Sequence, residues 1–269
     1  MHGLNGYREV IESLIWGIRS LGHGVTDAVN SADPDALNII FGAQVLPVSF
    51  METLPKNTIV YNFEQLRGLD KEEIRPEIHF IARNFAIWEY SRANLDSWKL
   101  LGARDPILVP VSYSPNLTRI PKFPVQDIDV LIYGLSGEKR LEAFHALSQA
   151  GLVVAFVSGL YGEARDILIA RSKIILNVNL YDFSRIFEIV RVSYLLANKK
   201  AVVCVSDSDT YFEEEFLSAV KLTPMKTLVE TVSFLLENDG ERQQLETSGY
   251  EIFSKRNIQA VLREVLSNY

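Results

Sequence analysis

Two oppositely charged side chains, Arg185 and Glu188, follow an apolar run and a polar loop within the segment 173–205. The loop carries four side chains able to hydrogen-bond: Asn177, Asn179, Tyr181 and Asp182. Ser184 has the side chain of a helix N-cap, so we predict a helix from there to about Asn198. Open parallel α/β sheets bind ligands at the carboxyl ends of their strands. The spacing therefore places Arg185 and Glu188 one turn apart at a ligand-binding edge, beside a positive helix dipole.

A glycine-rich turn over 133–140 directly follows a predicted strand. Glycines at Gly134 and Gly137 let backbone N–H groups approach a phosphate, and the helix that follows adds positive potential. Arg140 would hold a diphosphate through two parallel hydrogen bonds. The turn matches neither the dinucleotide fingerprint nor the P-loop. Such turns also occur for purely geometric reasons, so phosphate binding stands beside a structural interpretation.

The segment 173–205 resembles the donor-sugar region of glycosyltransferases with the GT-B fold, best the CgeB-like, family-1-like members. The resemblance rests on an R-x-F-E pattern at Arg185, Phe187 and Glu188, followed by an apolar strand over Ala201–Val205. It covers most of the chain and is best over 129–205. It implies two Rossmann-like α/β/α domains and a metal-independent transfer of a sugar from a nucleotide-sugar to a hydroxyl-bearing acceptor.

The resemblance also implies roles for particular side chains. Glu188 would bind the ribose hydroxyls, Arg185 would face the diphosphate or sugar, and Tyr161 would stack on the base. The full donor-binding set is Gly134, Ser136, Arg140, Tyr161, Asn179, Tyr181, Arg185 and Glu188. The alternatives are ordinary ones: Tyr161 as a turn aromatic that covers the core, and Glu188 with Arg191 as a surface ion pair worth at most about 0.5 kcal/mol.

The first half of the chain offers candidate acceptor-side residues. Asn62 and Glu64 follow a predicted strand, and Glu64 is the candidate general base that takes a proton from the acceptor hydroxyl. Local capping by Glu64 is the competing interpretation. His23 and Trp88 complete the acceptor-side set, although helical spacing also fits Trp88 as a core residue.

Metal and hydrolase chemistry have little support in the sequence. Asp207 and Asp209 resemble a D-x-D motif, but they end a late strand, which favours a solvated loop. Four scattered histidines and one cysteine, Cys204, give no zinc-ligand spacing. We therefore expect no metal and no cofactor.

Alternating apolar strands and amphipathic helices indicate an α/β fold in two halves, 1–124 and 125–269. The proline-containing stretch 112–126 is the predicted linker, and the last helix is expected to pack back on the first half. The predicted helices are 7–21, 85–101, 138–149 and 163–171, with further helices from 227 to 268. The predicted strands are 25–29, 38–41, 58–61, 107–111, 129–133 and 152–157, besides those of the segment 173–205.

Composition sets the class of protein. A net charge of −7 argues against nucleic-acid binding. No run of 18 apolar residues and no signal peptide are visible, and the lone cysteine fits a reduced, buried thiol, so we expect a cytoplasmic protein. Almost nothing precedes the first helix, so the first sheet is expected to lack its first strand and to offer an edge for a homo-oligomer.

The sequence leaves two other functions open. Leu180 and Leu196 stand where many retaining relatives of the resembled family carry a second glutamate, which leaves room for a non-catalytic nucleotide-sugar-binding scaffold. A nucleotide-sugar epimerase shares the same architecture. A glycosyltransferase is the leading hypothesis.

Overall fold

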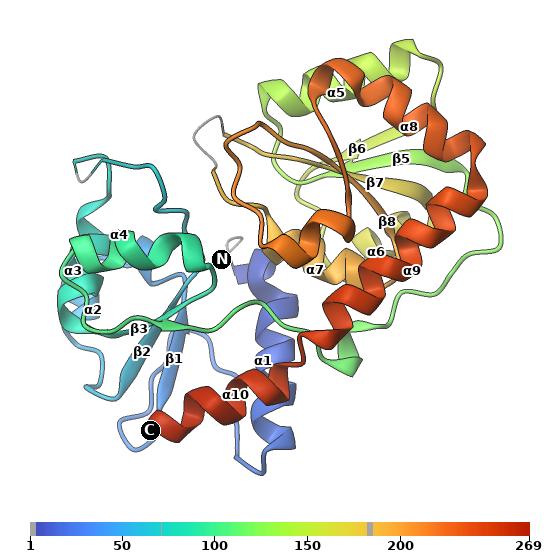
Figure 1. The fold of residues 1–269 in the computed structure, drawn as a ribbon. Helices are drawn as coiled ribbons and strands as arrows, with labels where there is room; N and C mark the ends of the chain where they lie inside the picture. Colours follow the sequence, from blue (N-terminus) through green and yellow to red (C-terminus); the bar gives the residue numbers. More distant parts are fainter. Residues whose placement is uncertain (1–3, 71, 182–184) are drawn as a thin grey trace. The chain divides into compact units, whose positions relative to one another are not determined.

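A computed structural model describes residues 4–70, 72–181 and 185–269 of the protein. The chain forms two compact α/β units, each built on one parallel sheet (Figure 1). The first unit combines Met1–Val111 with Ile258–Tyr269, and the second is Ser112–Asn257.

Short apolar runs form the four-stranded sheet of the first unit, in the order β1-β2-β3-β4 with all pairs parallel. β1 and β4 are its edges, and no strand precedes the first helix among the described residues. The strands are β1 (Asn38–Phe41), β2 (Thr58–Asn62), β3 (Ala86–Glu89) and β4 (Ile107–Leu108).

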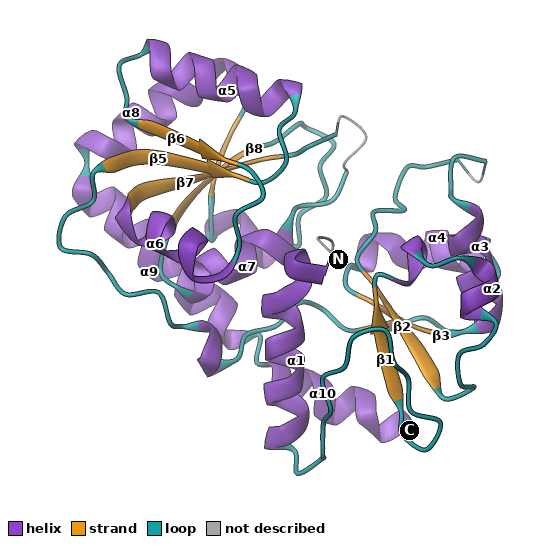
Figure 2. Cartoon of the chain, turned by 180° about the vertical axis from the view of Figure 1, so that it is seen from behind, coloured by secondary structure: helices purple, strands orange, loops and turns teal. Residues whose placement is uncertain are grey.

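Helices cover both faces of this sheet because successive side chains of each strand point to opposite sides. Val60 and Ile87 pack against α2–α4, whereas Trp88 contacts Tyr269, just after α10. α10 in turn packs on α1, as both views of the chain show (Figures 1 and 2). The helices are α1 (Arg8–Ser20), α2 (Val48–Met51), α3 (Pro76–Asn84), α4 (Leu95–Leu100) and α10 (Ile258–Val265).

The second unit has a five-stranded parallel sheet in the order β6-β5-β7-β8-β9. α5 and α8 pack on one face, and α6, α7 and α9 lie on the other (Figure 1), so the sheet is doubly wound. The strands are β5 (Ile128–Tyr133), β6 (Val154–Val157), β7 (Ser172–Val178), β8 (Ala201–Val205) and β9 (Lys221–Thr223). The helices are α5 (Glu138–Gln149), α6 (Gly162–Arg171), α7 (Ile189–Ala197), α8 (Leu228–Glu237) and α9 (Asp239–Lys255).

Short 3-10 helices occupy several of the connections. They are η1 (Leu4–Tyr7), η2 (Ala43–Val45), η3 (Arg92–Asn94), η4 (Pro115–Leu117), η5 (Glu214–Ser218), η6 (Met225–Thr227) and η7 (Leu266–Asn268). None of the described helices is long and apolar enough to cross a membrane.

The predicted α/β fold with two parallel sheets is confirmed, and three predicted elements are wrong. Residues 25–29 form no strand. Residues 85–101 form β3, a turn and α4 instead of one helix, because Ser91 turns the chain by accepting a hydrogen bond from Ala93 N. The helix predicted from Ser184 begins only at Ile189; Ser184 and Asp182 lie outside the described residues.

The stretch 112–126 is more than a linker. It belongs to the second unit, where three hydrogen bonds from Asn198 fix it and a fourth anchors Asn198 to α7. Its Oδ1 accepts from the N–H groups of Arg119 and Ile120, and its Nδ2 donates to the carbonyls of Leu117 and Tyr194.

Candidate functional site

The candidate site lies at the carboxyl edge of the second sheet, where the loops after β5, β7 and β8 meet. Arg140 joins two of these loops: its Nε donates to Val178 O at 2.8 Å and its Nη1 donates to Leu135 O at 2.7 Å. The Arg140 side chain is only 1% exposed. Two of its three guanidinium nitrogens therefore bind the protein's own backbone, which does not favour the predicted two-bond grip of Arg140 on a diphosphate.

The turn after β5 requires glycine at Gly134. Its φ is +123°, and an added Cβ would lie 2.9 Å from Arg140 Nη1 and 3.0 Å from Arg191 Nη2. Gly137 is the N-cap residue of α5 and supplies no side-chain cap. The N-terminus of this 12-residue helix thus has no cap from its own N-cap side chain, and the positive end of a helix dipole favours an anion there.

Arg140, Glu188 and Arg191 form what we call the arginine–glutamate cluster. Arg140 Nη2 lies 3.6 Å from Glu188 Oε1, and Arg191 Nε lies 3.5 Å from Glu188 Oε2. These are ion pairs without hydrogen-bond geometry. Arg140 Nη2 and Glu188 Oε2 are buried and have no hydrogen-bond partner among the described residues. Buried polar groups in this state are uncommon and call for an explanation, such as a ligand or water.

The cluster carries two positive charges and one negative charge. Arg191 also donates from Nη1 to Tyr133 O at 2.9 Å and stacks its guanidinium over the Tyr133 ring. Burial, and next the charge of Arg191, lowers the pKa of Arg140 to about 10, although the charge of Glu188 acts in the opposite direction. The site therefore lacks one negative charge, which a bound anion would supply.

Arg185 and Glu188 are not one helical turn apart, which corrects the sequence prediction. The chain from 185 to 187 is extended and pairs with Tyr211: Tyr211 N donates to Arg185 O, and Phe187 N donates to Tyr211 O. Glu188 occupies the N-cap position of α7, and Arg185 forms an ion pair with Asp209 at 2.5 Å.

The acidic loop after β8 is engaged in ion pairs. Asp209 contacts Arg185, and Asp207 Oδ2 lies 3.0 Å from Lys139 Nζ in the first turn of α5. In the described part of the chain, no three His, Cys, Asp or Glu side chains gather as metal ligands would. Cys204 is buried in β8, and burial raises the pKa of its thiol.

The remaining predicted donor-binding residues lie on the same edge with different exposure. Ser136 and Tyr181 are exposed, and Asn179 is buried. Tyr161, at the start of α6 and after β6, is also exposed. Of the predicted set, direct contacts bring together Gly134, Arg140 and Glu188, and Tyr181 is near enough to affect the pKa of Arg140.

In the first unit, Glu64 follows the carboxyl end of β2 and is partly buried. Its Oε1 accepts from Gln44 Nε2 at 2.7 Å. Burial, and next the charge of Glu64, raises the pKa of Tyr7 to about 12. Tyr7, Gln44 and Glu64 thus form a small polar group at this edge of the first sheet.

Three other side chains that the sequence predicts on the acceptor side are not arranged as expected. Trp88 is fully buried and donates to Tyr269 OH at 3.2 Å, so it cannot line a site in this conformation. Asn62 is buried and donates to Glu89 and to the carbonyl of Glu64. His23 is exposed in the loop before β1, which leads to the amino end of the sheet, whereas Glu64 follows the carboxyl end.

Sequence reasoning missed three residues. For Arg191 the sequence predicts only a surface ion pair with Glu188, although the i, i+3 spacing is visible in it. Gln44 carries no pattern that would find it. The sequence predicts a helix at Glu89, but this residue ends β3 and accepts hydrogen bonds from Asn62, Ser91, Asn94 and Trp98.

Comparison with known proteins finds a relative of similar sequence and many similar structures. No family model matches the chain. An uncharacterised protein of Acanthamoeba polyphaga mimivirus, L140, is 24% identical over 244 residues, which span 86% of this chain and 76% of that protein.

Three crystal structures illustrate the fold. HepE of Anabaena, in complex with UDP and glucose, gives a TM-score of 0.60 at 13% identity over 82% of this chain and 73% of that one. AviGT4, a glycosyltransferase involved in avilamycin A biosynthesis, gives a TM-score of 0.58 at 15% identity over 98% of this chain and 89% of that one. A glycosyltransferase from Rickettsia africae gives a TM-score of 0.60 at 10% identity over 98% of this chain and 93% of that one. The chain therefore has the GT-B glycosyltransferase fold, as the sequence resemblance implied.

Proposed function

We propose that the protein is a glycosyltransferase that binds a nucleotide-sugar at the carboxyl edge of its second sheet. The observation that carries this proposal is the arginine–glutamate cluster, which has an excess positive charge and unsatisfied buried atoms beside a glycine turn. The anion of a nucleoside diphosphate supplies the missing charge. Similar structures add support, because HepE was crystallised with UDP and with UDP-glucose.

Within this proposal, Arg191 replaces Arg140 as the residue that meets the diphosphate. The Arg191 side chain is 23% exposed, whereas Arg140 is 1% exposed and holds two backbone carbonyls. Arg140 then positions the turn and keeps its charge close to the leaving group. Fixed cations and the N-terminus of α5 stabilise a diphosphate as the glycosidic bond breaks, which is the basis for proposing that no metal is needed.

Glu188 takes the role of ribose ligand, since one carboxylate can accept from two vicinal hydroxyls. Tyr161 is exposed and remains the proposed base-stacking residue. Glu64 remains the proposed general base toward an acceptor hydroxyl, in which case Gln44 orients its carboxylate. We also retain the proposal that the exposed edge of the first sheet pairs two copies of the chain.

Calorimetric titration tests the donor site. The ligands are UDP, GDP, TDP and their sugars, titrated in excess chelator. They should bind wild-type protein. They should also bind the control Glu230→Gln, which changes an exposed glutamate on α8. Glu188→Gln should bind the parent nucleoside about tenfold or more weakly, because it loses a charge-assisted hydrogen bond. Equal affinity in all three proteins would remove Glu188 from the site.

Arg191→Lys keeps the charge and loses the planar fork. It should lose at least about tenfold in affinity for the diphosphate while its affinity for the nucleoside changes little. Equal weakening of both ligands would mean that Arg191 only supports the fold.

Turnover assays separate transfer from the two alternatives. Product formed only with an acceptor supports a transferase. Product without acceptor would indicate an epimerase or hydrolysis, and tight binding without any product would indicate a scaffold. Loss of turnover in chelator, restored by manganese, would overturn metal independence.

A further inference from the structure

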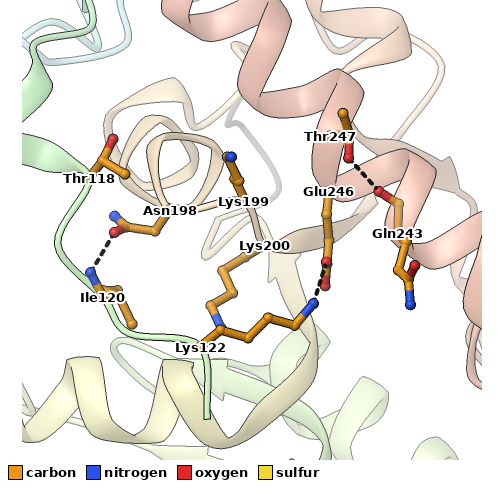
Figure 3. Close-up of a pocket in the computed structure, with 9 residues that line it drawn as sticks. All are labelled: Thr118, Ile120, Lys122, Asn198, Lys199, Lys200, Gln243, Glu246 and Thr247. Atoms are coloured by element: carbon orange, nitrogen blue, oxygen red, sulfur yellow. Dashed lines mark hydrogen bonds and ion pairs between the residues drawn. The ribbon is translucent and has the colours of Figure 1, made fainter. Parts of the chain in front are cut away.

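The second unit contains a cavity of about 350 Å³ that the proposed transfer reaction does not use (Figure 3). A volume in the range of roughly 300–1,000 Å³ is typical of sites for small molecules. Its lining is Thr118, Ile120, Lys122, Asn198, Lys199, Lys200, Gln243, Glu246 and Thr247.

The cavity lies at the opposite edge of the sheet from the arginine–glutamate cluster. The turn Asn198–Lys200 leads into the amino end of β8, whereas the cluster lies beyond the carboxyl ends of the strands. The other walls are the stretch 118–122 and one side of α9. A ligand here would therefore be separate from a bound nucleotide-sugar.

The walls are held in place before any ligand arrives. Asn198 uses all four of its hydrogen bonds on the backbone of 117–120 and of Tyr194. Thr118 donates to Ala197 O at 2.9 Å. The polar lining thus keeps its shape, and binding would not require the walls to become ordered first.

Lys200 is the most unusual part of this lining. It is only 4% exposed, and its ammonium forms no hydrogen bond and no ion pair with the residues that the structure describes. Burial lowers the pKa of Lys200 to about 8; the charge of Glu246 raises it and that of Lys122 lowers it. Burial of most of this side chain disfavours its charge, which points to a ligand in the cavity that supplies the negative charge.

The rest of the lining leaves the cavity positive. Lys122 Nζ lies 3.5 Å from Glu246 Oε2, and Lys199 Nζ lies 4.7 Å above the ring of Tyr250. The lining thus carries three ammonium groups and one carboxylate. In Figure 3 the side chains of Lys122 and Lys200 extend into the space between the 118–122 stretch and α9.

We propose that this cavity is a second anion site, which binds a small phosphorylated molecule such as a sugar phosphate. Lys200 and Lys122 would meet the phosphate, and Gln243 and Thr247 would offer amide and hydroxyl groups to the rest of the ligand. The site is independent of the proposed transferase activity and would hold its ligand whether or not a nucleotide-sugar is bound.

Thermal unfolding with inorganic phosphate, glucose 6-phosphate and glucose tests the proposal on the full chain. Each phosphate compound at about 100 times its Kd should raise the Tm of wild type by roughly 5 °C or more, and glucose should not. Lys56→Met, which changes an exposed lysine of the first unit, should respond like wild type. Lys200→Met should lose the response, and its own Tm should be higher than that of wild type because a buried charge is gone.

Two further variants separate this site from the donor site. Lys122→Met changes a side chain that is 68% exposed, so the fold tolerates it, and it should weaken the response severalfold. Arg191→Lys should leave the response unchanged. The proposal is overturned if Lys200→Met still responds, if Arg191→Lys abolishes the response, or if wild type shows none.

Discussion

Glu89 shows how a buried carboxylate can organise a sheet edge. It is fully buried, and its two oxygens accept from Asn62 Nδ2, Ser91 N, Asn94 Nδ2 and Trp98 Nε1 at 2.6–3.0 Å. Those four bonds hold together the end of β2, the end of β3 and α4. They also favour the ionised form, but burial is the larger effect and raises the pKa of Glu89 to about 7.

This pKa gives a pH-dependent stability. Between about pH 4.5 and 7 the folded state binds more protons at Glu89 than the unfolded state, so the free energy of unfolding falls as pH rises. The fall is up to roughly 3 kcal/mol. Glu89→Gln should be less stable than wild type, because an amide N–H group would face other hydrogen-bond donors. The gap between the two proteins in free energy of unfolding should narrow from about pH 4.5 to 7, because only the stability of wild type falls. Urea unfolding at several pH values measures the gap; a gap that widens with pH would show that the four donors outweigh burial.

Gly134 offers a second test at the level of one residue. Gly134→Ala forces an L-residue to φ +123° and pushes a methyl group against two guanidinium groups. We expect a loss of about 1–3 kcal/mol in stability and weaker diphosphate binding. Gly240→Ala, in α9 with open space around it, should instead be neutral or stabilising by up to about 1 kcal/mol. Equal unfolding midpoints for the two variants would contradict this account of the turn.

At the level of elements, the segment 185–188 shows why the site was only partly predictable. Local signals favoured a helix, but Ile186 and Phe187 are buried at 2% and 4% exposure, and they pair with a loop 25 residues later in the chain. Such a long-range contact leaves no local pattern. The sequence therefore predicts the correct edge of the sheet for Arg185, Phe187 and Glu188. It predicts the wrong backbone conformation there, a helix in place of an extended segment.

Packing of Phe187 should hold this segment extended. Its ring lies 4.7 Å from that of Phe212 and 6.0 Å from that of Phe216. Phe187→Ala should cost about 3–5 kcal/mol and speed hydrogen exchange at the amides of Phe187 and Tyr211. The matched control Phe234→Ala removes a ring that is 48% exposed on α8 and should cost far less. If both variants unfold at the same denaturant concentration, the ring cluster does not hold the segment.

For the whole molecule, the second unit was easier to predict than the first. Its strands β5, β7 and β8 are central and buried on both faces, so they appear as continuous Ile, Leu and Val runs, and α5 has the predicted bounds. In the first unit, β3 is a four-residue strand whose aromatic and apolar residues continue into α4 with helical spacing. Periodicity alone cannot separate a short buried strand from a helix.

The end of the chain completes the first unit. Ile258 and Leu262 of α10 are buried, and their side chains approach Gly17 so closely that an added Cβ would lie 2.6 Å from Leu262 Cδ1. Tyr269, beyond α10, covers Trp88. A segment that follows the second unit in sequence thus stabilises the first unit. The stability of the first unit therefore depends on residues that come after the second unit in the chain.

Truncation after Asn257 tests this dependence. Without α10, the apolar face of α1 and the ring of Trp88 lose their cover, so the first unit should unfold at a lower temperature while the second changes little. Scanning calorimetry with hydrogen exchange resolves the two units. Leu262→Ala should move the first unit in the same direction by about 2–5 kcal/mol, and the exposed Arg263→Ala should shift it by less than about 0.5 kcal/mol. Unchanged exchange in the first unit after truncation would show that α10 is dispensable and that the sheet is stabilised by α1–α4 alone.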